Sequence, residues 1–313
     1  MRRRDFLTSA AAAAAPFVFV RTGSARQNQQ ARLARIAIMS LTFGSILKNA
    51  NAPDSPTRTL DLMDLGEMYA DRFGVHNVEL QHSYLPSTDP GWLQAFRRRL
   101  ESTKSRVTNI NLEFGGTMTM TAESPVGRQQ AIDLTRRWIE HAAILGCPRV
   151  MVNQGTPTEE NKATAIAVLR TMNDYGKTRG VKVSVENRAA AGGGRRGSDA
   201  PAAPAGPPPP APPPPHILLT EIIKASGAYA NVDLANFGDQ PVQHAGMRAM
   251  FPYTVGNTHM RLNVARYDLP AALKIMRDEI KYQGIYLIEA GIPAGPDPFQ
   301  AIADVRAVVL EHM

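Results

Sequence analysis

The stretch "EENKATAIAVLRTMNDYGKTRGVKVSVEN", residues 159–187, contains the unit from which the fold is predicted. Its first part carries apolar residues at helical spacing and ends at Gly180, a residue type that commonly closes helices. The run 181–187 then alternates apolar and polar residues, which predicts a strand. This strand ends in Glu186, a carboxylate that is costly to bury without a partner.

The same alternation of strand and helix patterns continues along the chain on both sides of this stretch. Short apolar runs predict eight strands, at 35–43, 76–81, 106–114, 149–155, 181–187, 228–237, 257–263 and 284–291. Helix-period segments between them include 59–74, 127–146, 159–180 and 269–284, each of which ends at a glycine. Eight strand–helix units over residues 35–313 predict parallel strands closed into a (β/α)8 TIM barrel. An open doubly wound sheet is the rival, but no glycine-rich phosphate-binding sequence follows the first strand.

One repeat is interrupted by residues 189–215, "AAAGGGRRGSDAPAAPAGPPPPAPPPP". This composition cannot bury a core, so we expect a disordered insertion, flexible in its Gly/Ala part and extended in its proline runs. Proline runs also serve as ligands of SH3-type domains, but a tolerated loop insertion is the simpler interpretation. Because it follows the fifth strand, the insertion is predicted at the C-terminal face of the barrel.

The amino-terminal end has the pattern of an export signal. Three arginines precede an apolar run at residues 10–20, and the small residues 23–25 provide a cleavage site. The run is too short for a stable membrane-spanning helix, and an uncleaved signal anchor is the alternative. The sequence "RRDFL", residues 3–7, resembles twin-arginine signals, which implies the twin-arginine export machinery and a periplasmic or secreted location. Residues 1–25 are therefore left out of the predicted barrel.

Charge and cysteine content bear on several classes of protein. The formal net charge is +7, and removal of residues 1–25 deletes four arginines and one aspartate, which lowers it to +4. No basic run alternates with aromatic residues, so nucleic-acid binding is not expected. The single cysteine, Cys147, excludes an internal disulfide and a cysteine-based zinc site, and we expect it to pack as a small apolar residue.

Four side chains of the kinds that bind metals stand at the ends of consecutive predicted strands. They are Glu186, Asp233, His259 and Glu289. The interval from Asp233 to His259 is 26 residues, and the next interval, to Glu289, is 30. The interval from Glu186 to Asp233 is 47, but 27 of these residues belong to the insertion. Each interval is therefore one strand–helix–strand step, and the strand ends of a barrel converge on one pocket.

Three carboxylates aimed at one point repel each other unless a cation lies between them. With one imidazole they form a donor set for a divalent ion with open coordination positions, and this set suits manganese, magnesium, cobalt or zinc. Each residue also has an ordinary alternative, because a strand-end glutamate is often solvated and a histidine often bonds a carbonyl. Their occurrence on four successive strand ends favours the metal site.

The segments that carry these residues resemble the xylose isomerase-like TIM-barrel superfamily of sugar (phosphate) isomerases and epimerases. The resemblance covers residues 35–312 outside the insertion and is carried by "VELQ" (78–81), "LGCPRVMV" (145–152), "VSVENR" (183–188), "NVDLANFGD" (231–239), "THMRLN" (258–263) and "IYLIEAG" (285–291). It implies that the four strand-end residues bind one ion, with manganese favoured. It further implies that Glu186 and Glu289 form the acid/base pair that moves a proton at carbon through a metal-stabilised enediolate.

Polar residues at other strand ends are predicted to contact a sugar substrate. They are Glu79, His82, Glu113, Gln154, Asn236, Arg261 and Arg266. Three of them mark departures from the family pattern: Asn236 stands in place of a common histidine, and Arg261 in place of a common lysine. Arg266 lies one position beyond a common arginine, whose place Ala265 takes. These departures leave the metal ligands unchanged.

The sequence as a whole predicts an exported, metal-dependent isomerase or epimerase of a free sugar or sugar derivative. The same metal and carboxylates also suit a lyase or hydrolase that acts on an oxidised sugar. A third interpretation is a barrel that binds carbohydrate without turnover. The sequence is compatible with a homo-oligomer, and no stable membrane span is expected after removal of the signal.

Overall fold

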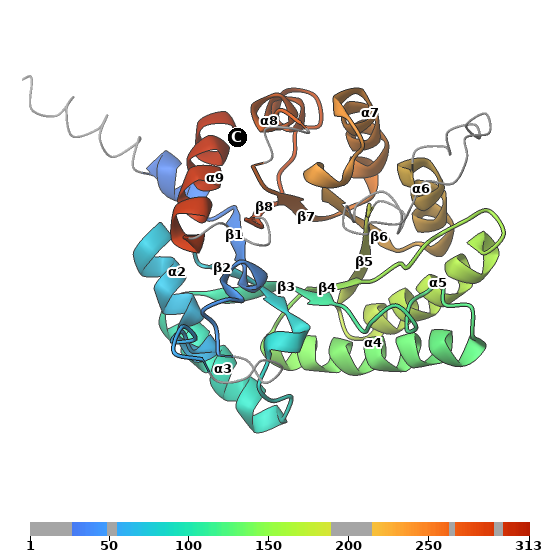
Figure 1. The fold of residues 1–313 in the computed structure, drawn as a ribbon, viewed down its shortest axis with the longest axis horizontal. Helices are drawn as coiled ribbons and strands as arrows, with labels where there is room; N and C mark the ends of the chain where they lie inside the picture. The colour runs from blue at the N-terminus through green and yellow to red at the C-terminus, as the bar shows by residue number, and fades with distance from the viewer. Residues whose placement is uncertain (1–26, 49–54, 189–214, 263–266, 291–296) are drawn as a thin grey trace, which may run out of the picture.

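A computed structural model of the chain describes residues 27–48, 55–188, 215–262, 267–290 and 297–313. Parallel strands pair in chain order and close into a barrel, which confirms the predicted (β/α)8 architecture (Figure 1). The strands are β1 (Ile36–Met39), β2 (Asn77–Gln81), β3 (Arg106–Leu112), β4 (Arg149–Val152), β5 (Lys182–Glu186), β6 (Tyr229–Asp233), β7 (Thr254–Met260) and β8 (Ile285–Ile288). Pairing of β1 with β8 closes the ring, so none of these strands is left at an open edge.

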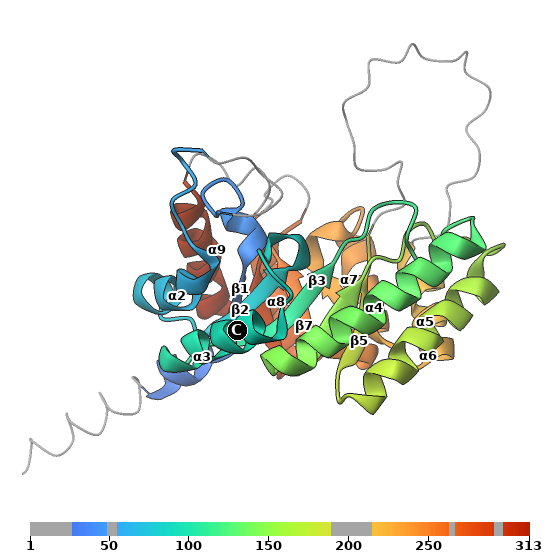
Figure 2. The same cartoon turned by 90° about the horizontal axis from the view of Figure 1, so that it is seen from below.

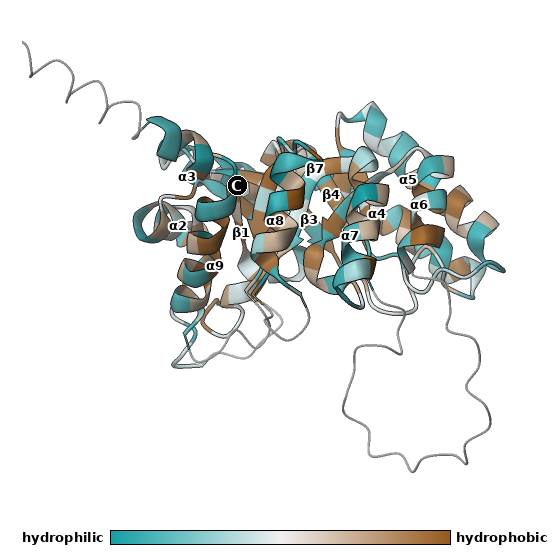
Figure 3. Cartoon of the chain, turned by 90° about the horizontal axis from the view of Figure 1, so that it is seen from above, coloured by the Kyte–Doolittle hydropathy of each residue, from teal (hydrophilic) through white to brown (hydrophobic). Residues whose placement is uncertain are grey.

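Helices connect the strands and surround the barrel. They are α2 (Leu65–Phe73), α3 (Pro90–Ser102), α4 (Pro125–Leu145), α5 (Lys162–Thr178), α6 (Pro215–Ser226), α7 (Gln240–Met250), α8 (Leu269–Asp278) and α9 (Pro298–His312). From α2 to α7 each helix packs on the next one in the chain, and α8 packs on α9; Figure 2 shows α4, α5 and α6 side by side along one flank. Their surfaces carry both apolar and polar residues (Figure 3), as expected for helices that cover a barrel on one face and meet water on the other. No helix among the described residues is both long and apolar enough to cross a membrane.

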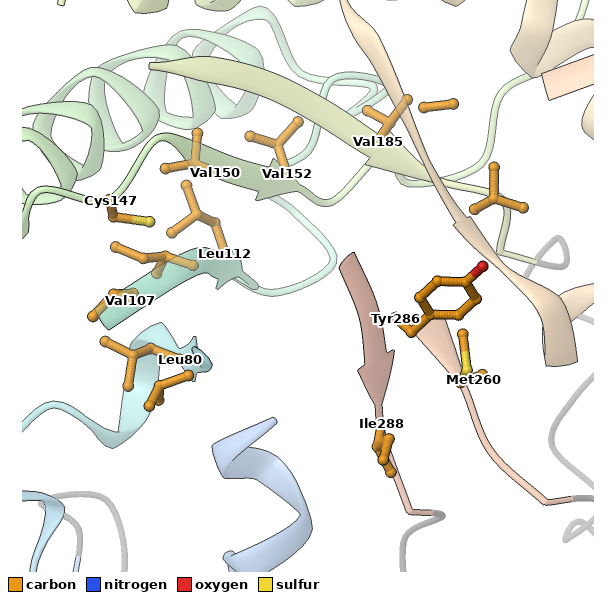
Figure 4. Close-up of a cluster of buried hydrophobic side chains, with 14 of the residues drawn as sticks. Leu80, Val107, Leu112, Cys147, Val150, Val152, Val185, Met260, Tyr286 and Ile288 are labelled. Atoms are coloured by element: carbon orange, nitrogen blue, oxygen red, sulfur yellow. The ribbon is translucent and has the colours of Figure 1, made fainter. Parts of the chain in front are cut away.

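Side chains alternate between the two faces of each strand. The outward face is apolar: Val150, Val152 and Val185 pack in one continuous core that also includes residues of the helices (Figure 4). A separate small cluster on β1 and β8, which includes Met39 and Leu287, fills part of the barrel interior. Because the outward layer supplies the main core, the inward positions near the C-terminal strand ends can carry polar groups.

Cys147 precedes β4 and lies in the main core, as expected from the sequence (Figure 4). Its side chain is buried, and the Sγ atom donates to the carbonyl oxygen of Arg149 at 3.2 Å. Burial raises the pKa of this thiol to about 12. Cys147 is therefore protonated near neutral pH and serves as packing.

The predicted helix ends are correct at some positions and wrong at one. Gly74 and Gly146 adopt left-handed φ angles of 64° and 69° directly after α2 and α4, as predicted for C-terminal caps. Gly284 does not close a helix, because α8 already ends at Asp278 and the chain turns through Lys281, at φ 55°. A Cβ atom at Gly284 would lie 2.7 Å from the carbonyl oxygen of Gly256, so glycine permits close packing there.

Three predictions fall outside the described residues. These are the export signal at residues 1–25, the substrate contact at Arg266, and the insertion, of which only Pro215 is described, as the first residue of α6.

Candidate metal centre

Four consecutive strand ends bring Glu186, Asp233, His259 and Glu289 to one point inside the barrel. Asp233 and His259 are direct neighbours in the pairing of β6 with β7. Glu289 follows β8, and its backbone N–H donates to the carbonyl of Met260 at 3.0 Å, so the ladder continues past the strand. Each residue therefore owes its position to the pairing of its strand with the next one.

The four side chains form a compact and buried cluster of donor atoms. One ligand-type atom from each residue lies within 4.8 Å of the others, and the exposed fractions range from 0% for Asp233 to 8% for Glu289. The Nδ1 atom of His259 lies 3.0 Å from Glu186 Oε1 and 3.5 Å from Glu289 Oε2. Three carboxylates and one imidazole at this spacing fit a divalent metal ion.

The other ring nitrogen of His259 faces a carboxylate deeper in the barrel. Nε2 lies 2.9 Å from Glu79 Oε1, an ion-pair contact in which the two atoms are not aligned as a hydrogen bond. Asn257 Nδ2 donates to Glu79 Oε2 and to Asn231 Oδ1, both at 2.9 Å. Glu79 is fully buried, so its charge is compensated by these neighbours and not by water.

The electrostatics of His259 show how strongly this point attracts positive charge. Burial by itself lowers the pKa of an imidazole. Here Glu79, Glu186 and Glu289 outweigh burial, and the pKa of His259 is raised well above its ordinary value. A position that favours a buried positive charge is electrostatically suited to a cation.

Arg261 bridges two of the three strand-end carboxylates. Its guanidinium contacts Asp233 Oδ2, lies 3.6 Å from Glu289 Oε1, and donates to Asn236 Oδ1 at 3.4 Å. Burial raises the pKa of Asp233 to about 6, although Arg261 opposes this rise. Burial alone would raise the pKa of Glu289 as well, but the histidine and Arg261 hold it below its ordinary value.

Arg188 contacts the third carboxylate of the cluster, that of Glu186. Its Nε donates to Glu186 Oε2 at 2.6 Å, and the guanidinium also forms an ion pair with Glu113 at the end of β3. Burial alone would raise the pKa of Glu186, but Arg188 and the histidine hold it below its ordinary range. The Glu186 side chain is thereby kept ionised and fixed in position.

A cavity of about 710 Å³ opens onto the cluster at the C-terminal ends of the strands. Its polar wall includes Gln81, Asn111, Glu113, Arg188, His216, Asn236 and Arg261, together with Glu186, His259 and Glu289. Its apolar wall includes Met39, Leu41, Met151, Phe237 and Val242. The volume and the mixture of hydroxyl-binding and apolar side chains suit a small polar molecule.

Comparison with known proteins agrees with this architecture. Residues 69–199, which contain β2 to β5, match the sequence family described as "Xylose isomerase-like TIM barrel". This segment, which carries Glu186, is thus similar to xylose isomerase-like TIM barrels. No curated protein matches it at the level of sequence.

Solved structures share the fold of this barrel across most of its length. A D-psicose 3-epimerase in the presence of D-fructose is 13% identical, with a TM-score of 0.63, and the match covers 88% of this chain and 96% of that one. A 3-keto-D-glucoside 4-epimerase from E. coli is 13% identical, with a TM-score of 0.61 and coverages of 90% and 100%. A xylose isomerase-like protein from Mycobacterium smegmatis in complex with magnesium is 15% identical, with a TM-score of 0.60 and coverages of 90% and 97%.

The predicted substrate contacts that the structure describes fall into two groups. Glu113, Asn236 and Arg261 line the cavity. Glu79 lies beneath the imidazole of His259 and is not part of the cavity lining. Gln154 is buried outside the cavity lining. His82 also lies outside the lining: its Nδ1 accepts from the backbone N–H of Glu113, and its ring packs edge-on against Phe114 and Trp138, with centroid distances of 5.2 and 5.3 Å.

Arg188 and His216 are among the cavity residues that the sequence-based reasoning missed. Arg188 follows Glu186 by two positions, so the alternation of β5 already places it on the inward side. His216 stands at the other end of the insertion, at the second residue of α6, and it lines the same cavity. The sequence could have indicated this role, because His216 directly follows a loop predicted at the C-terminal face of the barrel, where the cavity lies.

Proposed function

We propose that this chain is a divalent-metal-dependent isomerase or epimerase of a sugar. The observation that carries the proposal is the buried cluster of three carboxylates and one imidazole on adjacent strand ends, open to a cavity of about 710 Å³. The similarity of the fold to sugar epimerases supports the same class of reaction. The proposal extends to manganese as the ion, with magnesium, cobalt and zinc compatible with the same donors.

The residues that would hold the ion are Glu186, Asp233, His259 and Glu289. When bound, a divalent ion supplies positive charge that stabilises negative charge developing on substrate oxygens. Arg188 and Arg261 keep three of these side chains in place, through Glu186 on one side and Asp233 and Glu289 on the other. The ligand set is therefore held in position by contacts within this chain.

Glu186 and Glu289 are the proposed acid/base pair. Both line the cavity, and they approach His259 Nδ1 from two different strand ends, β5 and β8. Removal of a proton from a carbon next to a carbonyl needs a carboxylate oxygen within reach of that carbon, and its return on the other face needs a second one. We propose that one of the two accepts the proton and the other delivers a proton to the product.

The substrate is proposed to be a free sugar that reaches the protein outside the cytoplasm. This part of the proposal rests on the export pattern of residues 1–25, with its "RRDFL" motif. Polar cavity residues such as Asn111, Glu113 and Asn236 provide amide and carboxylate groups for sugar hydroxyls.

The first test is the metal content of the purified protein before and after incubation with manganese. We expect about one ion per chain in the wild type, because the four donors form a single cluster. Asp233→Ala and His259→Ala should both lose the ion, since each removes one of four ligands. A wild-type protein that stays empty after incubation contradicts the proposal.

The second test follows proton transfer at carbon. Manganese-loaded protein is incubated with D-fructose, D-psicose or L-ribulose in deuterium oxide, and NMR measures product and deuterium at carbon. Glu289→Gln should slow exchange by about a hundredfold or more, because it removes a general base. Glu279→Gln is the matched control, since Glu279 is exposed and pairs with Arg248 on the surface. A cleaved or unsaturated product favours the lyase or hydrolase alternative, and binding without exchange favours a carbohydrate-binding barrel.

A further inference from the structure

His216 is a buried imidazole in the wall of the cavity with an unsatisfied ring nitrogen. Its side chain is only 6% exposed, and Nδ1 has no hydrogen-bond partner among the described residues. The ring packs edge-on against Phe237, with a centroid distance of 5.8 Å. Its backbone carbonyl accepts from Thr220 Oγ1 at 2.6 Å, so the residue is anchored in the first turn of α6. The imidazole is therefore fixed in place by packing while its polar atom is left without a bond.

A buried polar atom without a partner costs about 1–3 kcal/mol, so such an atom in a cavity wall is expected to take a partner from water or from a bound ligand. Burial also lowers the pKa of His216, which keeps the ring neutral near pH 7. A neutral imidazole offers one donor and one acceptor. A hydroxyl group can bond either nitrogen, because it both donates and accepts, whereas a carboxylate or phosphate offers acceptors only.

We propose that His216 hydrogen-bonds a hydroxyl group of the substrate and so contributes to the choice of sugar. This inference rests on the proposed function, since it takes the cavity to be a sugar site. His216 shares this wall with Asn236 and Phe237, two adjacent residues that follow β6 and also line the cavity. Packing against Phe237 fixes the orientation of the ring, so the bond selects for the position of the hydroxyl as well as for its presence.

The experiment compares His216→Phe, which keeps a planar ring without nitrogen, with His216→Asn, whose side-chain amide can replace Nδ1. Binding of D-fructose to the manganese-loaded full chain is measured by calorimetry, with manganese affinity measured on the same samples. We expect His216→Phe to weaken sugar binding about tenfold, and His216→Asn to recover part of that loss. Manganese affinity should be unchanged, because no hydrogen bond or ion pair among the described residues joins His216 to the four strand-end ligands.

A second readout does not depend on any variant. In wild-type protein labelled with ¹⁵N, D-fructose should shift the resonance of the His216 Nδ1 atom, as a new hydrogen bond changes its shielding. Equal sugar affinity in wild type and His216→Phe, or a resonance that does not move when sugar binds, overturns the proposed role of His216. Either result leaves the proposed sugar function standing. Wild-type protein that holds manganese but binds neither D-fructose, D-psicose nor L-ribulose overturns the sugar function and this inference together.

Discussion

His259 has carboxylates on both sides of its ring. Glu186 and Glu289 face Nδ1, and Glu79 faces Nε2 from within the barrel at 2.9 Å. Metal-binding histidines are commonly held by a carboxylate at the ring nitrogen that does not bind the metal. Glu79 stands in that place, because a proton kept on Nε2 leaves the lone pair of Nδ1 directed toward the cluster.

Glu79→Gln keeps the shape of the side chain and removes its charge. We expect manganese to bind about 10 to 100 times more weakly, since the carboxylate that favours the right tautomer is lost. Titration calorimetry measures this affinity without substrate. Glu140→Gln serves as the control, because Glu140 bonds Tyr175 and Arg179 away from the cavity. An unchanged affinity in Glu79→Gln would show that the contact with His259 has no influence on the metal.

At the scale of residues, spacing along the chain predicted the cluster but not the surroundings of every side chain. Glu186, Asp233, His259 and Glu289 come together because strand ends converge, which a sequence can reveal. His82 ends up in an aromatic group because Trp138, on α4, packs against it, and such long-range packing leaves no trace in local spacing. Glu79 is two residues short of the strand end, which is enough to place it beneath the cavity.

At the scale of elements, helix starts are set by short local bonds. The carboxylate of Asp89 accepts from the backbone N–H groups of Gly91 and Trp92, at 2.8 and 3.2 Å, and Pro90 occupies the first position of α3. This arrangement satisfies two N–H groups that have no partner within the helix. It explains why α3 begins at Pro90.

Asp89→Ala should lower the free energy of unfolding by about 1 kcal/mol, because these two N–H groups lose their acceptor. Chemical denaturation monitored by circular dichroism measures the change. Glu101→Ala removes the same charge from the other end of α3, where Glu101 forms an exposed pair with Arg97, and we expect a smaller loss. Equal losses in the two variants would mean that charge, and not capping, is responsible.

The end of α8 shows why element boundaries were harder to predict than elements. The apolar pattern continues beyond Asp278, because Ile280 and Tyr282 still pack inward. The backbone N–H groups of Glu279 and Ile280 both donate to the carbonyl of Ile275, which ends the helix in spite of that pattern. Tyr282 then donates its hydroxyl proton to the carbonyl of Ile285, so its side chain belongs to the approach to β8.

At the scale of the whole molecule, all four candidate metal ligands come from β5 to β8 and the residue after it. A ligand that binds only the folded state raises stability, by about 2.7 kcal/mol when its concentration is 100 times the dissociation constant. We therefore expect manganese to raise the midpoint of thermal unfolding and a chelator to reverse the effect. Calorimetry of the wild type and of Asp233→Ala tests this, since the variant should not respond. A response of equal size in Asp233→Ala would place the ion elsewhere.

The closed barrel was the most predictable property of the chain, because it depends on a pattern repeated eight times and not on any single contact. An error at a helix end, such as the one at Gly284, leaves the order and direction of the strands unchanged. The cavity wall depends instead on single residues that flank loops, such as Arg188 and His216, and there the repeat gives no guidance.

The environment of Cys147 also affects how the protein can be labelled. With its only thiol enclosed in the core and its pKa raised to about 12, the native fold presents no thiolate to alkylating reagents near neutral pH. A cysteine introduced at an exposed position such as Val126, which is 66% exposed at the start of α4, would then be the single reactive group. The wild-type sequence is thus already a suitable background for attaching one fluorophore or spin label at a chosen place, without first replacing any native residue.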